Sequence, residues 1–170
     1  MSEPPAARAD AALVATGPPV TVRRVVTAAE CGPVRALVLA HARHERSDVV
    51  VPADWADRVA GEIAAGHLDL FVAASGGAPI GYAAVTTDVA TWSAGRYAHL
   101  DCLFVAGGHR DRGIGRLLVG VVLDHVRERD LGELQWQTPA WNDDAIRFYR
   151  RLGARHATKE RFVLAAGRET

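Results

Sequence analysis

The feature that most constrains this chain is a strand, a glycine-rich turn and a helix in direct succession over residues 99–123. The apolar run 99–105 is typical of a buried strand, and residues 116–123 place apolar side chains at helical spacing. Between them lies the turn Arg110-Asp111-Arg112-Gly113-Ile114-Gly115. A helix N-terminus offers unpaired N–H groups and the positive end of a dipole, so this segment predicts a cradle for an anion such as phosphate.

Two glycines and three arginines suit this cradle to a phosphate group. Gly113 and Gly115 carry no Cβ, so a ligand can approach the backbone closely. Arg110, Arg112 and Arg116 can add positive charge at the rim. The spacing differs from the G-x-G-x-x-G of a dinucleotide loop, and the Gly-Lys-Ser/Thr ending of a P-loop is missing. The alternative interpretation is a tight turn with solvated arginines.

The composition fits one globular domain without a nucleic-acid or membrane partner. The chain has 170 residues and a formal net charge of zero, which favours neither nucleic acid nor an anionic membrane. It contains no long apolar run and no signal-peptide pattern, so we expect a cytoplasmic protein. Residues 1–19, rich in Ala and Pro, predict a flexible tail, and residues 20–170 a single domain. Cys31 and Cys102 are expected to be reduced and unpaired.

Hydrophobic periodicity and turn residues predict the element order β-α-α-β-β-β-α-β-α-β, a mixed α/β fold. The first helix begins at a capping box formed by Thr27 and Glu30. The expected strands cover residues 20–26, 68–74, 80–87, 97–106, 133–138 and 155–166, the last as one strand or a pair. The expected helices run from 27 to 43 or 45, 52 to 66, 114 to 129 and 141 to 153.

A second motif lies near the C-terminus, where Asn142 and Tyr149 stand in the spacing N-x-x-A-x-x-F-Y-x-x-x-G-A. The phenol of Tyr149 can protonate a thiolate at neutral pH, because its ordinary pKa of about 10 lies above that of a thiol, about 8.5. Its alternative role is that of a packed aromatic on a helix face. Asn142 can contact a ligand, cap the helix, or do both.

The two motifs together resemble the GNAT superfamily of N-acetyltransferases, whose R/Q-x-x-G-x-G/A turn binds the pyrophosphate of acyl-CoA. Over about residues 20–166 the chain looks most like the spermidine/spermine (diamine) N-acetyltransferase group. This likeness is carried by the segments 42–45, 80–83, 91–92, 100–105 and 141–154. It implies a mostly antiparallel central sheet flanked by helices, with splayed central strands, and a homodimer.

The resemblance also implies roles for individual residues. Tyr149 would be the general acid, and the N–H of Val105 would polarise the thioester carbonyl. His41 and His44 lack the spacing of a zincin, so we expect no metal site. The residues expected to hold acetyl-CoA are Leu103, Phe104, Val105, Arg110, Asp111, Arg112, Gly113, Ile114, Gly115, Arg116 and Asn142.

Asp101 is the candidate proton acceptor. Strand alternation predicts that His99, Asp101, Leu103 and Val105 share one face and that Cys102 points the other way. A carboxylate in an apolar strand must be paired or functional, so Asp101 could bind an ammonium, relay its proton, or pair with a structural arginine. His99 is the weaker candidate base.

The expected acceptor is a small primary amine, bound by His44, Glu45 and Asp101. The chain departs from the diamine group where an E-D pair becomes Asp101-Cys102 and where an aromatic residue becomes His44. Fewer carboxylates weaken the attraction for a polycation, so polyamines, amino acids and amine-bearing antibiotics all stay open. The alternatives are acetylation of a protein or aminoacyl amine, and a non-catalytic acyl-CoA-binding regulatory module.

Overall fold

The computed structural model describes residues 18–164, divided between Gln137 and Thr138 into two compact units. The tail predicted over residues 1–19 lies outside the described residues except for Pro18 and Pro19. The carbonyl of Pro18 accepts a 3.0 Å hydrogen bond from the hydroxyl of Ser75. Within residues 18–164, none of the helices combines the length and apolar character that crossing a bilayer requires.

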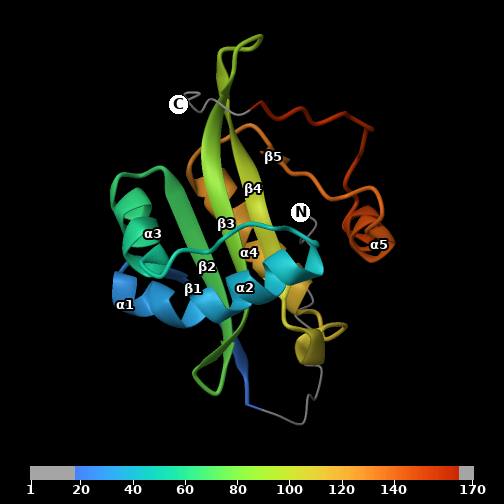
Figure 1. Ribbon diagram of the computed structural model, residues 1–170. Coiled ribbons are helices and arrows are strands. Elements are labelled where there is room, and N and C mark those ends of the chain that lie inside the picture. Colours follow the sequence, from blue (N-terminus) through green and yellow to red (C-terminus); the bar gives the residue numbers. More distant parts are fainter. Residues whose placement is uncertain (1–17, 165–170) are drawn as a thin grey trace, which may run out of the picture. The chain divides into compact units, whose positions relative to one another are not determined.

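The first unit is built on an open, mixed five-stranded sheet in the order β1-β2-β3-β4-β5 (Figure 1). The first four strands are antiparallel neighbours, and β5 pairs with β4 in parallel at only two positions. The strands are β1 Val20–Val25, β2 Leu68–Ser75, β3 Ala78–Ala90, β4 Gly95–Val105 and β5 Leu134–Gln135. The mixed, mainly antiparallel sheet predicted from the sequence is therefore confirmed.

The expected first helix is divided into three pieces. Its capping box is present, with the Thr27 side chain accepting from the Glu30 N–H and the Glu30 carboxylate accepting from the Thr27 N–H. Pro33 lacks an N–H, and here the chain forms a short 3-10 turn between two α-helical pieces. The pieces are α1 Ala28–Cys31, η1 Gly32–Val34 and α2 Arg35–His44.

Helices cover both faces of the sheet (Figure 1). Helices α1, α2 and α3 (Trp55–Ala64) lie on one face, where Val34, Leu37 and Ile63 pack in one core cluster with Tyr82 and Phe104. Helix α4, Ile114–Glu128, lies on the other face, and its apolar positions pack against Ala83, Val85, Ala98 and Leu100. Periodicity predicted α4 within one residue, whereas α3 begins three residues after the predicted Pro52.

The buried carboxylate of Asp69 connects three elements of this unit. Asp69 lies on β2 and is 4% exposed. It pairs with Arg24 of β1 at 2.5 Å, and with His125 and Arg129 at the end of α4, both at 2.8 Å. A buried charge is costly without partners, so this arrangement fixes the end of α4 against the sheet.

Strand β4 carries a β-bulge at Asp101, which corrects the predicted side-chain alternation. Cys102 pairs with Ala84 of β3, and Leu100 pairs with the next residue, Val85, so Asp101 has no partner on β3. One extra residue in a strand moves every later side chain to the opposite face of the sheet. Leu103 and Val105 pack on the α4 side, whereas Cys102 and Phe104 pack on the α2 side together with Asp101. The predictions that Asp101 shares a face with Val105 and that Cys102 points away from Asp101 are wrong.

Two predicted strands are shorter or absent. Residues 133–138 give only β5, and no strand forms over residues 155–164, while 165 and 166 lie outside the described residues. The apolar side chains of Phe162, Val163 and Leu164 are exposed in this segment. Because β-propensity expresses packing on a paired, half-buried surface, a run of such residues without a neighbouring strand stays irregular. Over its described residues, 138–164, the second unit contains one helix, α5 Asp143–Arg151.

Candidate active site

The predicted succession of strand, turn and helix is present from β4 to α4. After Val105 the chain forms a short 3-10 turn, η2 Gly107–His109, and enters α4 through Gly113, whose φ of 78° is left-handed. No side chain caps this helix, and its first hydrogen bond runs from the Leu117 N–H to the Gly113 carbonyl at 3.0 Å. The N–H groups of Ile114, Gly115 and Arg116 therefore have no acceptor within the helix. They can bind an anion such as phosphate.

The arginines of the turn divide into two groups. The Nε atom of Arg110 donates to the carbonyl of Val105 at 3.0 Å, and its guanidinium carbon lies 5.4 Å from the centre of the Phe104 ring. Arg110 thus fastens the turn to the end of β4. Arg112 and Arg116 are exposed beside the helix N-terminus, as is Asp111, whose φ of 58° is also left-handed. The positive charge at the rim comes mainly from Arg112 and Arg116.

The last part of β4 presents an open edge beside the cradle. The N–H of Ala106 donates to the carbonyl of Ile80 on the β3 side at 2.9 Å. Because successive residues of an antiparallel strand face opposite edges, the N–H of Val105 points away from β3. On that side, pairing with β5 stops at His99. The splayed strands expected from the sequence are present, and the open edge can hydrogen bond with an extended ligand whose anionic end lies in the cradle.

A buried polar cluster lies on the α2 face of the sheet. The Nδ1 atom of His41 lies 2.8 Å from the hydroxyl of Tyr82, and its Nε2 atom lies 3.3 Å from a carboxylate oxygen of Glu45. The imidazole stacks on Phe104 with 4.9 Å between ring centres. Burial lowers the pKa of His41, and the charge of Glu45 opposes this shift. Burial also raises the pKa of Tyr82, whose side chain is almost inaccessible, so its hydroxyl stays protonated.

The bulge residue Asp101 extends this cluster. Its carboxylate accepts from the thiol of Cys102 at 3.5 Å, and the thiol in turn hydrogen bonds with Tyr82. Burial and the charge of Asp101 raise the pKa of Cys102 to about 12. His44 lies beside the same Phe104 ring, with 6.2 Å between ring centres.

The structure thus gathers the three predicted acceptor-binding residues, His44, Glu45 and Asp101, around one cluster. Two residues that were not predicted as site residues, His41 and Tyr82, join them. Two signals were available: His41 and Glu45 are four positions apart on one helix, and Tyr82 is a polar residue in an apolar strand.

The second unit holds the other two predicted residues. The side-chain carbonyl of Asn142 accepts from the Ala145 N–H at 3.2 Å and caps α5, which leaves the Nδ2 group able to donate to a ligand. Tyr149 is half-buried, next to Phe148 at 5.2 Å between ring centres. The helix ends at Arg151, two residues before the predicted Gly153, which closes the helix end with a left-handed φ while the Ala154 N–H donates to the Tyr149 carbonyl at 3.2 Å.

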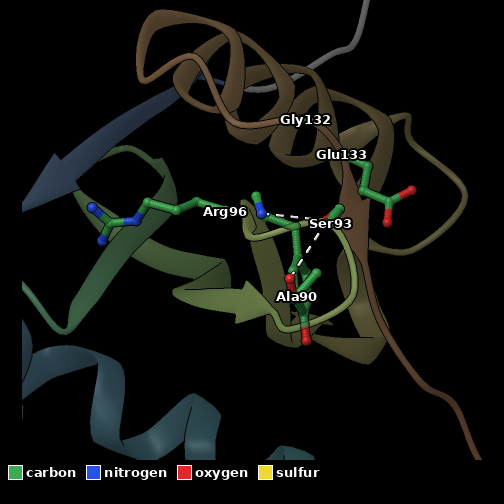
Figure 2. A pocket seen from close by; sticks show the side chains of 7 residues that line it. Ala90, Ser93, Arg96, Gly132 and Glu133 are labelled. Atoms are coloured by element: carbon green, nitrogen blue, oxygen red, sulfur yellow. Dashed lines mark hydrogen bonds between the residues drawn. The ribbon is translucent and has the colours of Figure 1, made fainter.

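A cavity of about 230 Å³ lies at the opposite end of β4 (Figure 2). Its loop is held by Ser93, whose hydroxyl donates to the Ala90 carbonyl and accepts from the Gly95 N–H. At about 3.4 Å per residue, roughly 30 Å of strand separates Arg96 in this cavity from Val105, so the cavity is not part of the cradle. The lining residues are Ala90, Ser93, Gly95, Arg96, Tyr97, Gly132 and Glu133.

Among the described residues, 18–164, no group of three or more His, Cys, Asp and Glu side chains is arranged to hold a metal ion. The side chains of the polar cluster around His41 are joined to one another by hydrogen bonds and an ion pair.

Comparisons with known proteins agree with this geometry. A sequence model of the Acetyltransferase (GNAT) family matches residues 36–154. A streptothricin acetyltransferase of Streptomyces lavendulae is 36% identical over 100 residues, which cover 59% of this chain and 50% of that protein. This chain therefore spans about half the length of that relative.

Solved structures share the fold. An aminoglycoside acetyltransferase from an uncultured soil metagenomic sample has a TM-score of 0.74 at 16% identity, over 86% of this chain and 96% of that chain. The aminoglycoside N-acetyltransferase AAC(6')-Iy, solved in complex with CoA, has a TM-score of 0.73 at 22% identity, over 91% of this chain and all of that chain.

Proposed function

This chain belongs to the acetyltransferase (GNAT) family, and from that premise we propose that it transfers an acetyl group from acetyl-CoA directly to a primary amine of a small molecule. The observation that carries the proposal is the uncapped N-terminus of α4 next to the open edge of β4. An extended arm can pair with the edge while its phosphates bind the helix N-terminus.

The donor would be held by two segments of the chain. The cradle residues Gly113, Ile114, Gly115 and Arg116 offer N–H groups to the pyrophosphate, and Arg112 adds charge. The edge residues Leu103, Phe104 and Val105 follow the arm, and Arg110 and Asp111 shape the turn between them. Asn142 would donate through its Nδ2 group. Acetyl-CoA bound there supplies the activated acyl group.

Three residues would then act on the reaction. The N–H of Val105 polarises the thioester carbonyl, because it points to the open edge. Asp101 takes the proton of the amine, since an alkyl ammonium with a pKa of about 10.4 is about 99.9% protonated at pH 7. Tyr149 protonates the departing thiolate. The carboxylates of Asp101 and Glu45, which both act on the same buried cluster, attract the cationic acceptor.

Among the small amines, the relatives favour an amine-bearing antibiotic over a polyamine. The curated relative is a streptothricin acetyltransferase, and both structures compared above are aminoglycoside acetyltransferases. The replacement of the E-D pair by Asp101-Cys102 supports the same choice, because one carboxylate fewer weakens the attraction for a polycation.

The test is release of the CoA thiol from acetyl-CoA with a panel of streptothricin, aminoglycosides, polyamines and lysine analogues. We expect turnover with an antibiotic amine that exceeds turnover with spermidine. Turnover with polyamines alone would contradict the acceptor class. Binding of acetyl-CoA by calorimetry without turnover of any amine would instead favour an acyl-CoA-binding regulatory module, and no binding would overturn the proposal.

A further inference from the structure

We propose that Asp101, Cys102, Tyr82, His41 and Glu45 form a side-chain proton relay, which carries the proton of the acceptor amine from the β4 bulge through the interior to the end of α2. This inference rests on the proposed function, because it concerns the proton that amine acetylation must remove. In it, Cys102, Tyr82 and His41 are positioning residues that act through Asp101.

The contacts form one continuous line across three elements. The carboxylate of Glu45 contacts His41 at 3.3 Å, and His41 contacts the Tyr82 hydroxyl at 2.8 Å. Tyr82 hydrogen bonds with the thiol of Cys102, which lies 3.5 Å from the carboxylate of Asp101. Both ends are accessible and the middle is not: Asp101 is exposed, Tyr82 is 2% exposed and the Glu45 side chain is 38% exposed.

A count of protons shows why this line can accept one more. The line has four contacts, which are Asp101–Cys102, Cys102–Tyr82, Tyr82–His41 and His41–Glu45. Each contact needs one proton to be a hydrogen bond. With both carboxylates ionised and His41 neutral, the imidazole, the phenol and the thiol carry one proton each. Three protons therefore serve four contacts, and one contact between the two carboxylates is left without a donor. One proton from the substrate completes the line.

The transfer balances without any other reactant. The ammonium gives one proton to Asp101 and becomes a neutral amine with its lone pair ready to attack. Once Asp101 is protonated, the thiol of Cys102, which had donated to the carboxylate, turns its proton toward Tyr82. Asp101 then passes a proton to the Cys102 sulfur while the thiol proton moves to the Tyr82 oxygen and the phenol proton moves to the Nδ1 atom of His41. Asp101 is ionised again, and His41 releases its Nε2 proton to Glu45 and solvent. No group ends with a changed charge, and the protons of His41, Tyr82 and Cys102 turn back to their starting directions before the next turnover.

The charges around His41 suit such a transient cation. Glu45 and His44 face it from α2, and Asp101 faces it from β4, while Tyr82 of β3 and Cys102 and Phe104 of β4 are uncharged. The two carboxylates favour the imidazolium, whereas burial and His44 oppose it. The relay can therefore hold a positive charge at His41 briefly without trapping it.

The test is Tyr82→Phe, which removes only the hydroxyl that joins His41 to Cys102. With kcat/KM measured from pH 6 to 10 on primary amines of graded basicity, we expect a loss of about tenfold to 10²-fold for strongly basic amines at pH 7, near the lower end of what a positioned proton acceptor contributes. The loss should shrink as pH rises. It should also vanish for weakly basic amines, which are already neutral at pH 7.

Two more variants distinguish loss of proton transfer along the relay from damage to the packing of the core. Cys102→Ala interrupts the same line from another strand and should give the same dependence on amine basicity. Tyr97→Phe removes a hydroxyl from β4 outside the line and should leave the profile unchanged. An equal loss for all amines in Tyr82→Phe, or no loss, would overturn the relay.

A readout independent of turnover distinguishes this inference from the proposed function. The midpoint for protonation of His41, followed by nitrogen NMR of its ring, should move to lower pH in Asp101→Asn, because the charge of Asp101 favours the imidazolium. In the Tyr82→Phe background the same substitution should move it less. An equal movement in both backgrounds would show coupling through space alone and would overturn the relay, even if no amine in the panel is acetylated.

Discussion

The Nδ1 atom of His41 and the hydroxyl oxygen of Tyr82 lie 2.8 Å apart and join α2 to the middle of the sheet. The His41 ring also stacks on Phe104 at 4.9 Å between ring centres, so a titratable group lies inside an apolar cluster. Burial lowers the pKa of His41 because the imidazolium loses its hydration, and Glu45 only partly compensates. The native state is therefore sensitive to acid at this position.

We predict that the protein loses stability as pH falls below about 6.5, the ordinary pKa of histidine. The unfolded chain binds the proton at a higher pH than the folded chain, so acid favours unfolding until pH falls through the lowered folded pKa. His41→Gln should remove this part of the slope when the free energy of unfolding is measured in urea between pH 8 and 5. His67→Gln, at an exposed histidine, should keep it, and a slope that persists in His41→Gln would contradict the assignment.

Tyr149→Phe should lower kcat by about 10- to 10⁴-fold if the phenol is the general acid. The replacement keeps the aromatic ring on α5 and removes only the proton donor, so binding of acetyl-CoA should change little. Release of the CoA thiol measures the effect, and Tyr97→Phe is the matched control on β4. Unchanged turnover in Tyr149→Phe would remove this residue from the mechanism.

Substitutions at two glycines distinguish the effect of the phosphate cradle from the effect of backbone strain. Gly113 and Gly66 both have a left-handed φ, 78° and 75°, and an added Cβ would meet no atom within 4 Å at either position. Replacement by Ala should destabilise each by a similar amount, about 1–2 kcal/mol. Only Gly113→Ala should also raise KM for acetyl-CoA, because Gly113 positions the free N–H groups of α4. Equal KM values in the two variants would contradict a phosphate site at this turn.

Local signals in the sequence predicted most of the first unit. The capping box at Thr27 and the turn that enters α4 through Gly113 depend on neighbours within a few residues, so they could be identified without tertiary information. The prediction of a strand over residues 155–166 was wrong over the described part, 155–164, for the complementary reason. Its apolar residues have the composition of a strand, but a strand also depends on a distant partner that the sequence does not reveal.

The difference between local signals and distant partners also explains the predictions for the residues around Asp101. Period-two alternation assumed an unbroken β4, and the bulge at Asp101 arises from its register with Ala84 and Val85, which are far away in the sequence. The hydrogen bond between His41 and Tyr82 spans 41 positions and is equally invisible to local reasoning. The turn at Gly113 was predictable because its geometry is local, whereas the surroundings of Asp101 depend on how three elements pack.

The thiol of Cys102 should be unusually unreactive for a half-buried cysteine. Burial and the neighbouring charge of Asp101 raise its pKa to about 12, so its thiolate fraction at pH 8 is about 10³-fold below that of an ordinary thiol. Iodoacetamide should label native Cys102 correspondingly slowly, and labelling should become rapid in denaturant. Cys31 is fully buried and should not contribute in the native protein.

Asp101→Asn tests whether the bulge brings this carboxylate to the thiol. Removal of the charge lowers the pKa of Cys102 toward its ordinary value while burial remains, so alkylation at pH 8 should accelerate but stay slower than in denaturant. Asp88→Asn, at an exposed carboxylate of β3, should leave the rate unchanged. If Asp101 instead pointed to the α4 face, as simple alternation predicts, neither substitution would alter the labelling of Cys102.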